Sequence, residues 1–532
     1  MWEAIADEGA GRTEAPSRRE FLLGAAASLL PAGARALATA PPARRPTLEM
    51  LGRDVALLQS AYERMHPGLL RYNTPEQIRA HCSRLQEELV ALPSTGAWLG
   101  GAYLAFARFA AKVRCGHTYA NFHNQSDLVK KALFEQADKV PAEFRWIGTT
   151  ILVTRDLSRE QALPAGTVIT AVNGMATAGL LAKLLEVARA DGSNDAKRIA
   201  QMEVQALERY EAFDVYLPLI APGANGRVSL ECRRPGRSAT ERIDVQAATY
   251  DERLAARRVD AGDERAGWRF DTGDARCAVL KMPDWALYDS KWDWKAFIAR
   301  CFQRLAADKP AALVLDLRGN EGGLDVGDEI LPHLVEHELW VDQPRRLVRY
   351  RDAPEDLRPF LDTWDPSFLH WGADAQPLDE RFYELRQEGR GTTQRRIAPR
   401  GPRFAGKVFV LIGPDNSSAT FQFAQTIRAA RLGTLVGRST GGNLRGINGG
   451  AFFFLRLPGC GLELDLPLIG QFPREAAPDA GIEPDIPVSV DVGQVLAGMD
   501  GDMAAVRAHL DAMDTAPRTI HPPDRDSRPV ES

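Results

Sequence analysis

The stretch from Gly406 to Arg431 constrains the fold of this 532-residue chain more than any other. It begins with an apolar run at 408–412, whose length and β-branched content predict a buried strand. A Gly-Pro-Asp-Asn turn at 413–416 ends that strand, and from Ser418 onward apolar residues recur at helical spacing. The pattern therefore predicts a strand, a tight turn, a serine and a helix in direct succession.

The serine at this junction has two interpretations. A hydroxyl in the first turn of a helix lies near backbone N–H groups that carry partial positive charge, which favours a nucleophile and its oxyanion. The alternative is that Asn416, Ser417 and Ser418 only cap the helix, as these residue types often do. This stretch by itself favours capping, and the other motifs of the chain reverse that preference.

Composition excludes several functional classes. The chain is 45% hydrophobic and 26% charged, which is typical of globular proteins, and its length suits two or three domains. A net charge of −5 gives no basis for binding nucleic acid or an anionic membrane. The six cysteines are scattered without a CxxC motif, so neither a zinc site nor a dense disulfide framework is predicted.

The N-terminus predicts a twin-arginine export signal over residues 1–38. Arg18 and Arg19 precede a short Ala/Leu-rich run at 23–30, and small residues at 36–38 suit cleavage after Ala38. The expected mature protein is therefore bacterial, and periplasmic or secreted.

A helical domain is expected over residues 46–125, because apolar residues recur there at helical spacing. The period changes from 3.6 to 2 at 113–122, which predicts a strand after the last helix. His117 would then lie at a helix-to-strand corner after a glycine, where an imidazole can project from the backbone.

The later regions are β-rich and then mixed. Residues 142–250 contain an Ala-Gly-x-Val-Ile-x-x-Val-Asn-Gly run that resembles the core of a PDZ-like domain, a module that adds an extended peptide to a sheet edge. Strands and helices alternate over 265–498, which predicts an α/β domain. Within it, the irregular stretch 339–401 is interpreted as an access-controlling or docking element. Residues 500–532 are expected to form a C-terminal helix and a flexible tail.

Several motifs in this order resemble the tail-specific, or C-terminal-processing, serine peptidases and their tricorn-like relatives. They are Asp316-Leu317-Arg318-Gly319-Asn320-x-Gly322-Gly323, Ser418-Ala419-x-x-x-Phe423-Ala424, Gly437-x-x-Thr440-Gly441-Gly442-Asn443, Gly481-Ile482-Glu483-Pro484-Asp485 and Cys115-Gly116-His117-Thr118. The resemblance implies a helical domain, a PDZ-like domain and a crotonase-like α/β peptidase domain. It also implies a hydrolase that cleaves peptide or protein substrates and needs no metal or cofactor.

The resemblance also implies roles for individual residues. The processing branch of the family pairs its serine with a lysine at the position of Asn443, and no lysine follows Lys407. The tricorn-like branch uses a histidine, so Ser418 is expected to be the nucleophile and His117 its general base. An ordinary imidazole base would make kcat/KM rise through an apparent pKa of about 6 to 7.5.

The oxyanion and orienting groups complete this expected site. Backbone N–H groups of Ala419 and of Gly322 or Gly323 would hold the oxyanion. Gly116 and Cys115 stand where relatives carry a serine and an aspartate, so the group that orients the imidazole is open. Glu483 is the predicted carboxylate, and its alternative role is turn chemistry before a proline.

Two other functions stay open at the level of sequence. Gly437-x-Ser439-x-Gly441 fits the nucleophile elbow of α/β-hydrolases, with Asp485 and His509 following in that fold's order, which would give an esterase. The glycine-rich segment after Ser439 is a poor start for the helix that an elbow needs. The third possibility is a catalytically inactive relative that binds peptides or lipophiles. A serine-directed fluorophosphonate separates these readings, because only an enzyme would have an activated serine.

Overall fold

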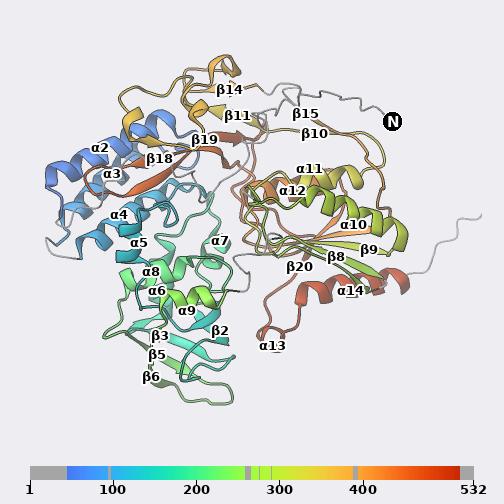
Figure 1. Cartoon of the computed structure of the whole chain (residues 1–532), viewed down its shortest axis with the longest axis horizontal. Coiled ribbons are helices and arrows are strands. Elements are labelled where there is room, and N and C mark those ends of the chain that lie inside the picture. The colour runs from blue at the N-terminus through green and yellow to red at the C-terminus, as the bar shows by residue number, and fades with distance from the viewer. Residues whose placement is uncertain are drawn as a thin grey trace, which may run out of the picture.

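The computed structural model describes residues 45–515 except 94–96, 258–264, 266, 275, 289 and 387–393. The predicted export signal and the tail beyond residue 515 lie outside the described residues. The described part is a mixed α/β protein with several sheets (Figure 1). None of the helices within that part is long and apolar enough to cross a bilayer.

Four helices form the N-terminal part, as the apolar spacing predicts. Their bounds are α2 Leu48–Met65, α3 Pro75–Val90, α4 Trp98–Val113 and α5 Asp127–Leu133. Thr47 and Thr74 cap α2 and α3, and the second of these caps is a complete capping box.

The strand predicted at 113–122 is absent from the structure. Arg114 ends α4 in the left-handed conformation, with φ of 61°, and turns without strand pairing follow it. Backbone groups of this segment are satisfied by side chains instead: Asp191 accepts from the N–H of Gly116, and Tyr103 donates to the carbonyl of Ala120. His117 therefore lies in a loop that neighbouring side chains hold in place.

The middle region, residues 142–250, forms a five-strand path β1-β2-β3-β5-β6, with β4 paired to β3. The strands are β1 Ala142–Ile147, β2 Thr150–Asp156, β3 Val168–Val172, β4 Met175–Ala176, β5 Arg227–Arg233 and β6 Glu241–Gln246. The helices are α6 Thr177–Leu185, α7 Asp195–Ala200 and α8 Ala212–Ile220, and α9 Tyr250–Ala255 follows. Between α7 and α8 the chain has no regular helix or strand.

A second six-stranded sheet has the order β20-β17-β16-β9-β8-β7 and is parallel except for β7. Its strands are β7 Arg269–Asp274, β8 Cys277–Lys281, β9 Ala312–Asp316, β16 Lys407–Ile412, β17 Thr434–Gly437 and β20 Ile486–Pro487. Its helices are α10 Trp294–Asp308, α11 Gly327–Ile330, α12 Ser418–Ala429, α13 Val492–Leu496 and α14 Gly501–Thr515. Figure 1 shows α10, α11 and α12 on one face of this sheet and α14 on the other.

The stretch 339–401, which the sequence suggested to be irregular, contributes short strands to a third sheet. That sheet has the order β12-β18-β19-β11-β14-β13, and β10 pairs with β15 beside it. The strands are β10 Leu339–Asp342, β11 Arg345–Val348, β12 Leu361–Asp362, β13 Ala375–Pro377, β14 Tyr383–Leu385, β15 Gln394–Ile397, β18 Asn448–Arg456 and β19 Glu463–Phe472. Its apolar residues share one core with the N-terminal helices and the middle region. Its longest strands, β18 and β19, pair with each other as an antiparallel hairpin.

Candidate active site

Two neighbouring strands of the parallel sheet bring the candidate serine and the candidate oxyanion loop together. β9 and β16 pair in parallel, with Leu411 opposite Asp316 near their carboxyl ends. The segments that follow these strands therefore emerge at the same edge of the sheet, where α/β proteins bind ligands. One segment carries Gly322 and Gly323, and the other carries Ser418.

Ser418 has a backbone conformation that non-glycine residues seldom adopt. Its φ is 50°, in the left-handed region, at the first residue of α12. Such a conformation costs about 1 kcal/mol or more and is typically found where function requires it. The half-buried Ser418 makes no side-chain hydrogen bond to the residues that the structure describes.

The structure argues against helix capping as the role of these polar residues. Ser417 occupies the cap position of α12, but its side chain makes no capping hydrogen bond. Its hydroxyl donates to the carbonyl of Glu321 at 3.1 Å and accepts from Lys197 Nζ at 2.8 Å. The Asn416 amide instead joins the turn to the loop after β9, donating to the carbonyls of Leu317 and Asn320.

Gly322 lies directly against the serine. A Cβ placed on Gly322 would be 2.8 Å from Ser418 Cβ and 3.0 Å from the backbone nitrogen of Ala419, so no larger residue fits. The N–H of Gly322 already donates to Asn320 Oδ1 at 2.9 Å. Within the described residues, the N–H groups of Gly323 and Ala419 make no hydrogen bond, so they are the ones available to an oxyanion.

His117 lines the same cavity as Ser418, Gly322 and Gly323, a space of about 1120 Å³. The imidazole is 9% exposed and packs near Gly449 and the ring of Phe452 on β18. Burial, together with the cations Arg189 and Lys197, lowers the pKa of His117 to about 3, so the ring is neutral near pH 7. Its Nδ1 has no hydrogen-bond partner in the part of the chain that the structure describes.

The structure does not place Glu483, the carboxylate predicted to orient this imidazole, in the cavity that His117 lines. Glu483 is exposed, its carbonyl accepts from Arg428, and it does not line the cavity. The preceding residue, Ile482, is held by Thr440 instead, which fixes the turn before Pro484. The segment therefore has the turn role that the sequence also allows.

The rival serine is similarly separate from the cavity. Ser439, Asp485 and His509 do not line it, and no helix follows Ser439 before β18 begins at Asn448. Asn443, at the position where the processing branch has lysine, is buried and donates to Asp479 and to the carbonyl of Asp191. Its role here is to join loops.

Three charged residues beside the site were missed by the sequence reasoning. Glu321 accepts from Arg189 at 2.8 Å and pairs with Lys197 at 3.2 Å. Burial opposes ionisation of Glu321, but the two cations outweigh it and hold the pKa of that carboxyl well below its usual range. Glu321 follows a recognised motif residue, yet nothing local in the sequence marks Arg189 or Lys197, which lie more than a hundred residues away.

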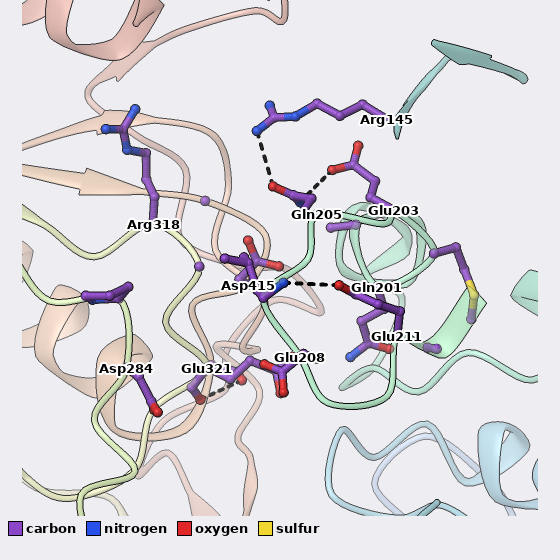
Figure 2. A pocket seen from close by; sticks show the side chains of 18 of the residues that line it. Arg145, Gln201, Glu203, Gln205, Glu208, Glu211, Asp284, Arg318, Glu321 and Asp415 are labelled. Carbon is purple, nitrogen blue, oxygen red and sulfur yellow. Dashed lines mark hydrogen bonds between the residues drawn. The ribbon is translucent and has the colours of Figure 1, made fainter. Parts of the chain in front are cut away.

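The rest of the cavity is bordered by carboxylates from both sides (Figure 2). Glu203 and Glu211 come from the middle region, while Asp284 and Asp415 come from loops of the parallel sheet. Burial raises the pKa of Glu203 to about 7 and that of Glu211 to about 8. Gln205 joins Glu203 to Arg145, as the dashed lines in Figure 2 show.

Comparisons with known proteins agree with this architecture. Residues 276–488 match the model of peptidase family S41. The solved structure of mature CPAF complexed with lactacystin has a TM-score of 0.57 and 14% sequence identity, covering 88% of this chain and 97% of that chain. A structure of mature CPAF alone has a TM-score of 0.55 and 14% identity, covering 88% and 96%.

A more distant likeness is that to the photosystem II D1 C-terminal processing protease, with a TM-score of 0.37, 16% identity and coverage of 86% and 98%. No protein of curated function matches the sequence significantly. At these identities the likeness to CPAF is one of fold.

Proposed function

We propose that Ser418 is the nucleophile of this protein and that His117 is its general base. The chain belongs to peptidase family S41 through its residues 276–488 and is a serine-type peptidase. The substrate is a peptide or protein. In this proposal, the Ser418 hydroxyl attacks the scissile carbonyl while neutral His117 accepts its proton. The N–H groups of Gly323 and Ala419 stabilise the oxyanion, and His117 then donates the proton to the leaving amine.

One observation carries this proposal: the left-handed backbone of Ser418, with Gly322 packed directly against it. A strained serine at a strand-to-helix turn is a conformation that the fold must enforce, and helix capping does not explain it. Support for His117 is its place in the same cavity and its neutral, buried imidazole.

Peptide hydrolysis by single variants tests the proposal. Ser418→Ala and His117→Ala should each lower kcat by several orders of magnitude, and the double variant should be little worse than either, since the two residues act together. Ser439→Ala is the matched control and should keep wild-type turnover, and Ser417→Ala, which keeps the nucleophile, should retain far more activity than Ser418→Ala. A fully active Ser418→Ala enzyme would contradict the proposal.

Ser417 with Lys197 is a second candidate pair, because their side chains are 2.8 Å apart. Two contacts speak against it. Lys197 pairs with the carboxylate of Glu321 at 3.2 Å, and the Ser417 hydroxyl donates its proton to the carbonyl of Glu321 rather than to Lys197. The same experiment separates the pairs, since this candidate requires Ser417→Ala to be the inactive variant.

The middle region is proposed to be PDZ-like and to bind substrate chain ends by strand addition. It is supported by the Val-Asn-Gly run at the end of β3 and by the edge strand β6, which pairs only with β5 among the described strands. Comparing one peptide as free acid and as amide tests this idea, because recognition of a carboxylate predicts weaker binding of the amide. Equal kcat/KM for the two forms would exclude recognition of chain ends.

Export by the twin-arginine route is also part of the proposal, supported by the Arg18-Arg19 pair and the apolar run after it. Replacing both arginines with lysine should retain the protein in the cytoplasm of an expressing bacterium. Undiminished export of that variant would contradict this route.

A further inference from the structure

Each candidate catalytic segment is held one or two residues before the residue that acts, which is His117, Ser418 or Gly323. Arg189 donates to the carbonyl of Gly116, which precedes His117, at 2.7 Å. Lys197 donates to Ser417, which precedes Ser418, at 2.8 Å. The carboxylate that joins these two cations belongs to Glu321, which precedes Gly322.

From this pattern we propose that Arg189, Lys197 and Glu321, here called the Glu321 cluster, are positioning residues that fix His117, Ser418 and the oxyanion loop relative to one another. None of the three is assigned a chemical step, because each acts through a neighbour in the chain. The inference rests on the proposed function, since it assumes that His117 and Ser418 are the reacting groups.

The origin of the cluster explains why such a link is needed. His117 follows the N-terminal helices, whereas Ser418 and Gly322 follow strands of the parallel sheet, so no shared element fixes the distance between them. Both cations come from the middle region, eight positions apart in sequence. The middle region therefore contacts all three catalytic segments through a single short stretch, 189–197.

The other contacts between these segments do not replace the cluster. Asn416 and Thr420 bind the carbonyl of Asn320 at 3.0 Å each, so they join the serine turn to the oxyanion loop. Neither reaches the segment of His117. Asp191 also accepts from Gly116, but within the described residues its carboxylate makes no hydrogen bond to the serine turn or the oxyanion loop. Arg189 joins the His117 segment to Glu321, and its guanidinium also lies 4.5 Å from the centre of the Tyr119 ring.

The burial of Lys197 indicates a geometric rather than a stabilising role. Its side chain is 1% exposed, and an ammonium is removed from water at a cost that ion pairing seldom exceeds. The helix that carries Lys197, α7, is fixed at its start by Asn194, which donates to the carbonyls of Thr440 and Gly442. The ammonium is therefore delivered to Ser417 and Glu321 by a helix that is itself anchored.

Removal of the cluster charges tests the inference. Lys197→Met keeps the length of the side chain and Glu321→Gln keeps its shape, so each removes one charge with little change of volume. We expect each to lower kcat about 100-fold, the loss that a misplacement of about 1 Å causes, while KM changes less than about threefold. The loss of kcat in the double variant should be no more than about twice the loss in the worse single variant, because the residues act as one unit. Lys183→Met, which removes an exposed lysine from α6, is the control and should behave as the wild type.

The double variant also guards against misfolding, because it removes the buried Lys197 ammonium together with its carboxylate partner, while Arg189 keeps the carbonyl of Gly116 as an acceptor. A wild-type kcat in Lys197→Met, or a double variant whose loss is the product of the single losses, would overturn the inference. So would an effect confined to KM. Ser418→Ala is measured in parallel: if it stays active, the proposed function fails, whereas an inactive Ser418→Ala beside an active Lys197→Met refutes only the positioning role.

Discussion

At the scale of single residues, the environment of His117 changes the expected pH dependence. An ordinary imidazole would give an activity limb at about pH 6 to 7.5. Burial and the cations Arg189 and Lys197 lower the pKa of His117 to about 3, so the base stays neutral throughout that range. We expect kcat/KM for the free enzyme to show no rise from His117 between about pH 5.5 and 8.

Steady-state kinetics on an uncharged peptide over that range measure this directly. Lys197→Met removes a cation and should move the acidic limb to higher pH, whereas Lys183→Met should leave it in place. A limb centred near pH 6.5 in the wild type that disappears in His117→Ala would show that the imidazole titrates normally.

The residues that the sequence predicts are those with a local signal. Ser418 and the glycines at 322 and 323 stand in short motifs directly after buried strands, so their proximity follows from parallel pairing. Arg189 and Lys197 carry no such signal, because their partners lie 73 to 220 positions away. Glu483 was predicted from the need for a carboxylate, but it is exposed and is not among the residues that line the cavity.

At the scale of elements, the loop after β9 is the part whose shape matters most to the nucleophile. A Cβ on Gly322 would lie 2.8 Å from Ser418 Cβ, and the φ of Gly322 is 111°. Gly322→Ala should therefore lower kcat at least about 100-fold, through displacement of the serine. Gly319→Ala is the control, because Gly319 has a φ of 81° but its Cβ would approach only Leu207, at 3.7 Å.

Both variants require a strained backbone, so their comparison isolates contact with the serine. Equal activity of Gly322→Ala and Gly319→Ala, with both proteins folded by circular dichroism, would show that the close approach of this loop has no catalytic role.

Helices and strands whose apolar residues recur with a clear period were predicted correctly, and the errors have identifiable causes. The strand at 408–412 and the helix after it appear as β16 and α12, with Phe423, Ala424 and Ile427 buried. Alternation at 113–122 did not give a strand, because its backbone is satisfied by side chains such as Asp191 and Tyr103 and by a single hydrogen bond from Asp465 of β19 to Tyr119, without a ladder. The strands of the stretch 339–401 are short, and two of them, β11 and β12, pair with β19 and β18, which lie far along the chain.

At the scale of the whole molecule, buried carboxyl groups predict a loss of stability at alkaline pH. Burial raises the pKa to about 7 for Glu203 and Asp465, and to about 8 for Glu211 and Glu463. These groups ionise more readily when unfolded, so the stability present at low pH is lost as the pH rises through their folded pKa values. Buried histidines do not oppose this trend above about pH 7, because they are then largely neutral in both states.

We therefore expect the melting temperature to fall by several degrees, roughly, between pH 7 and pH 8.5. Glu211→Gln should reduce that fall, since glutamine can still accept the hydrogen bond from Leu207 without becoming charged. Thermal melts followed by circular dichroism measure both. A melting temperature that rises over this interval would contradict the assignment of these carboxyl groups as buried and neutral.

The central claim is that Ser418 is an activated nucleophile in a site assembled from three parts of the chain. Mass-spectrometric mapping of the serine modified by a fluorophosphonate tests it most directly, with His117→Ala as the comparison. We predict one modified residue, Ser418, in the wild type, and labelling slowed by at least about 100-fold in His117→Ala. Modification of Ser417 or Ser439 in its place, or no modified serine in a folded protein that hydrolyses peptides, would contradict the claim.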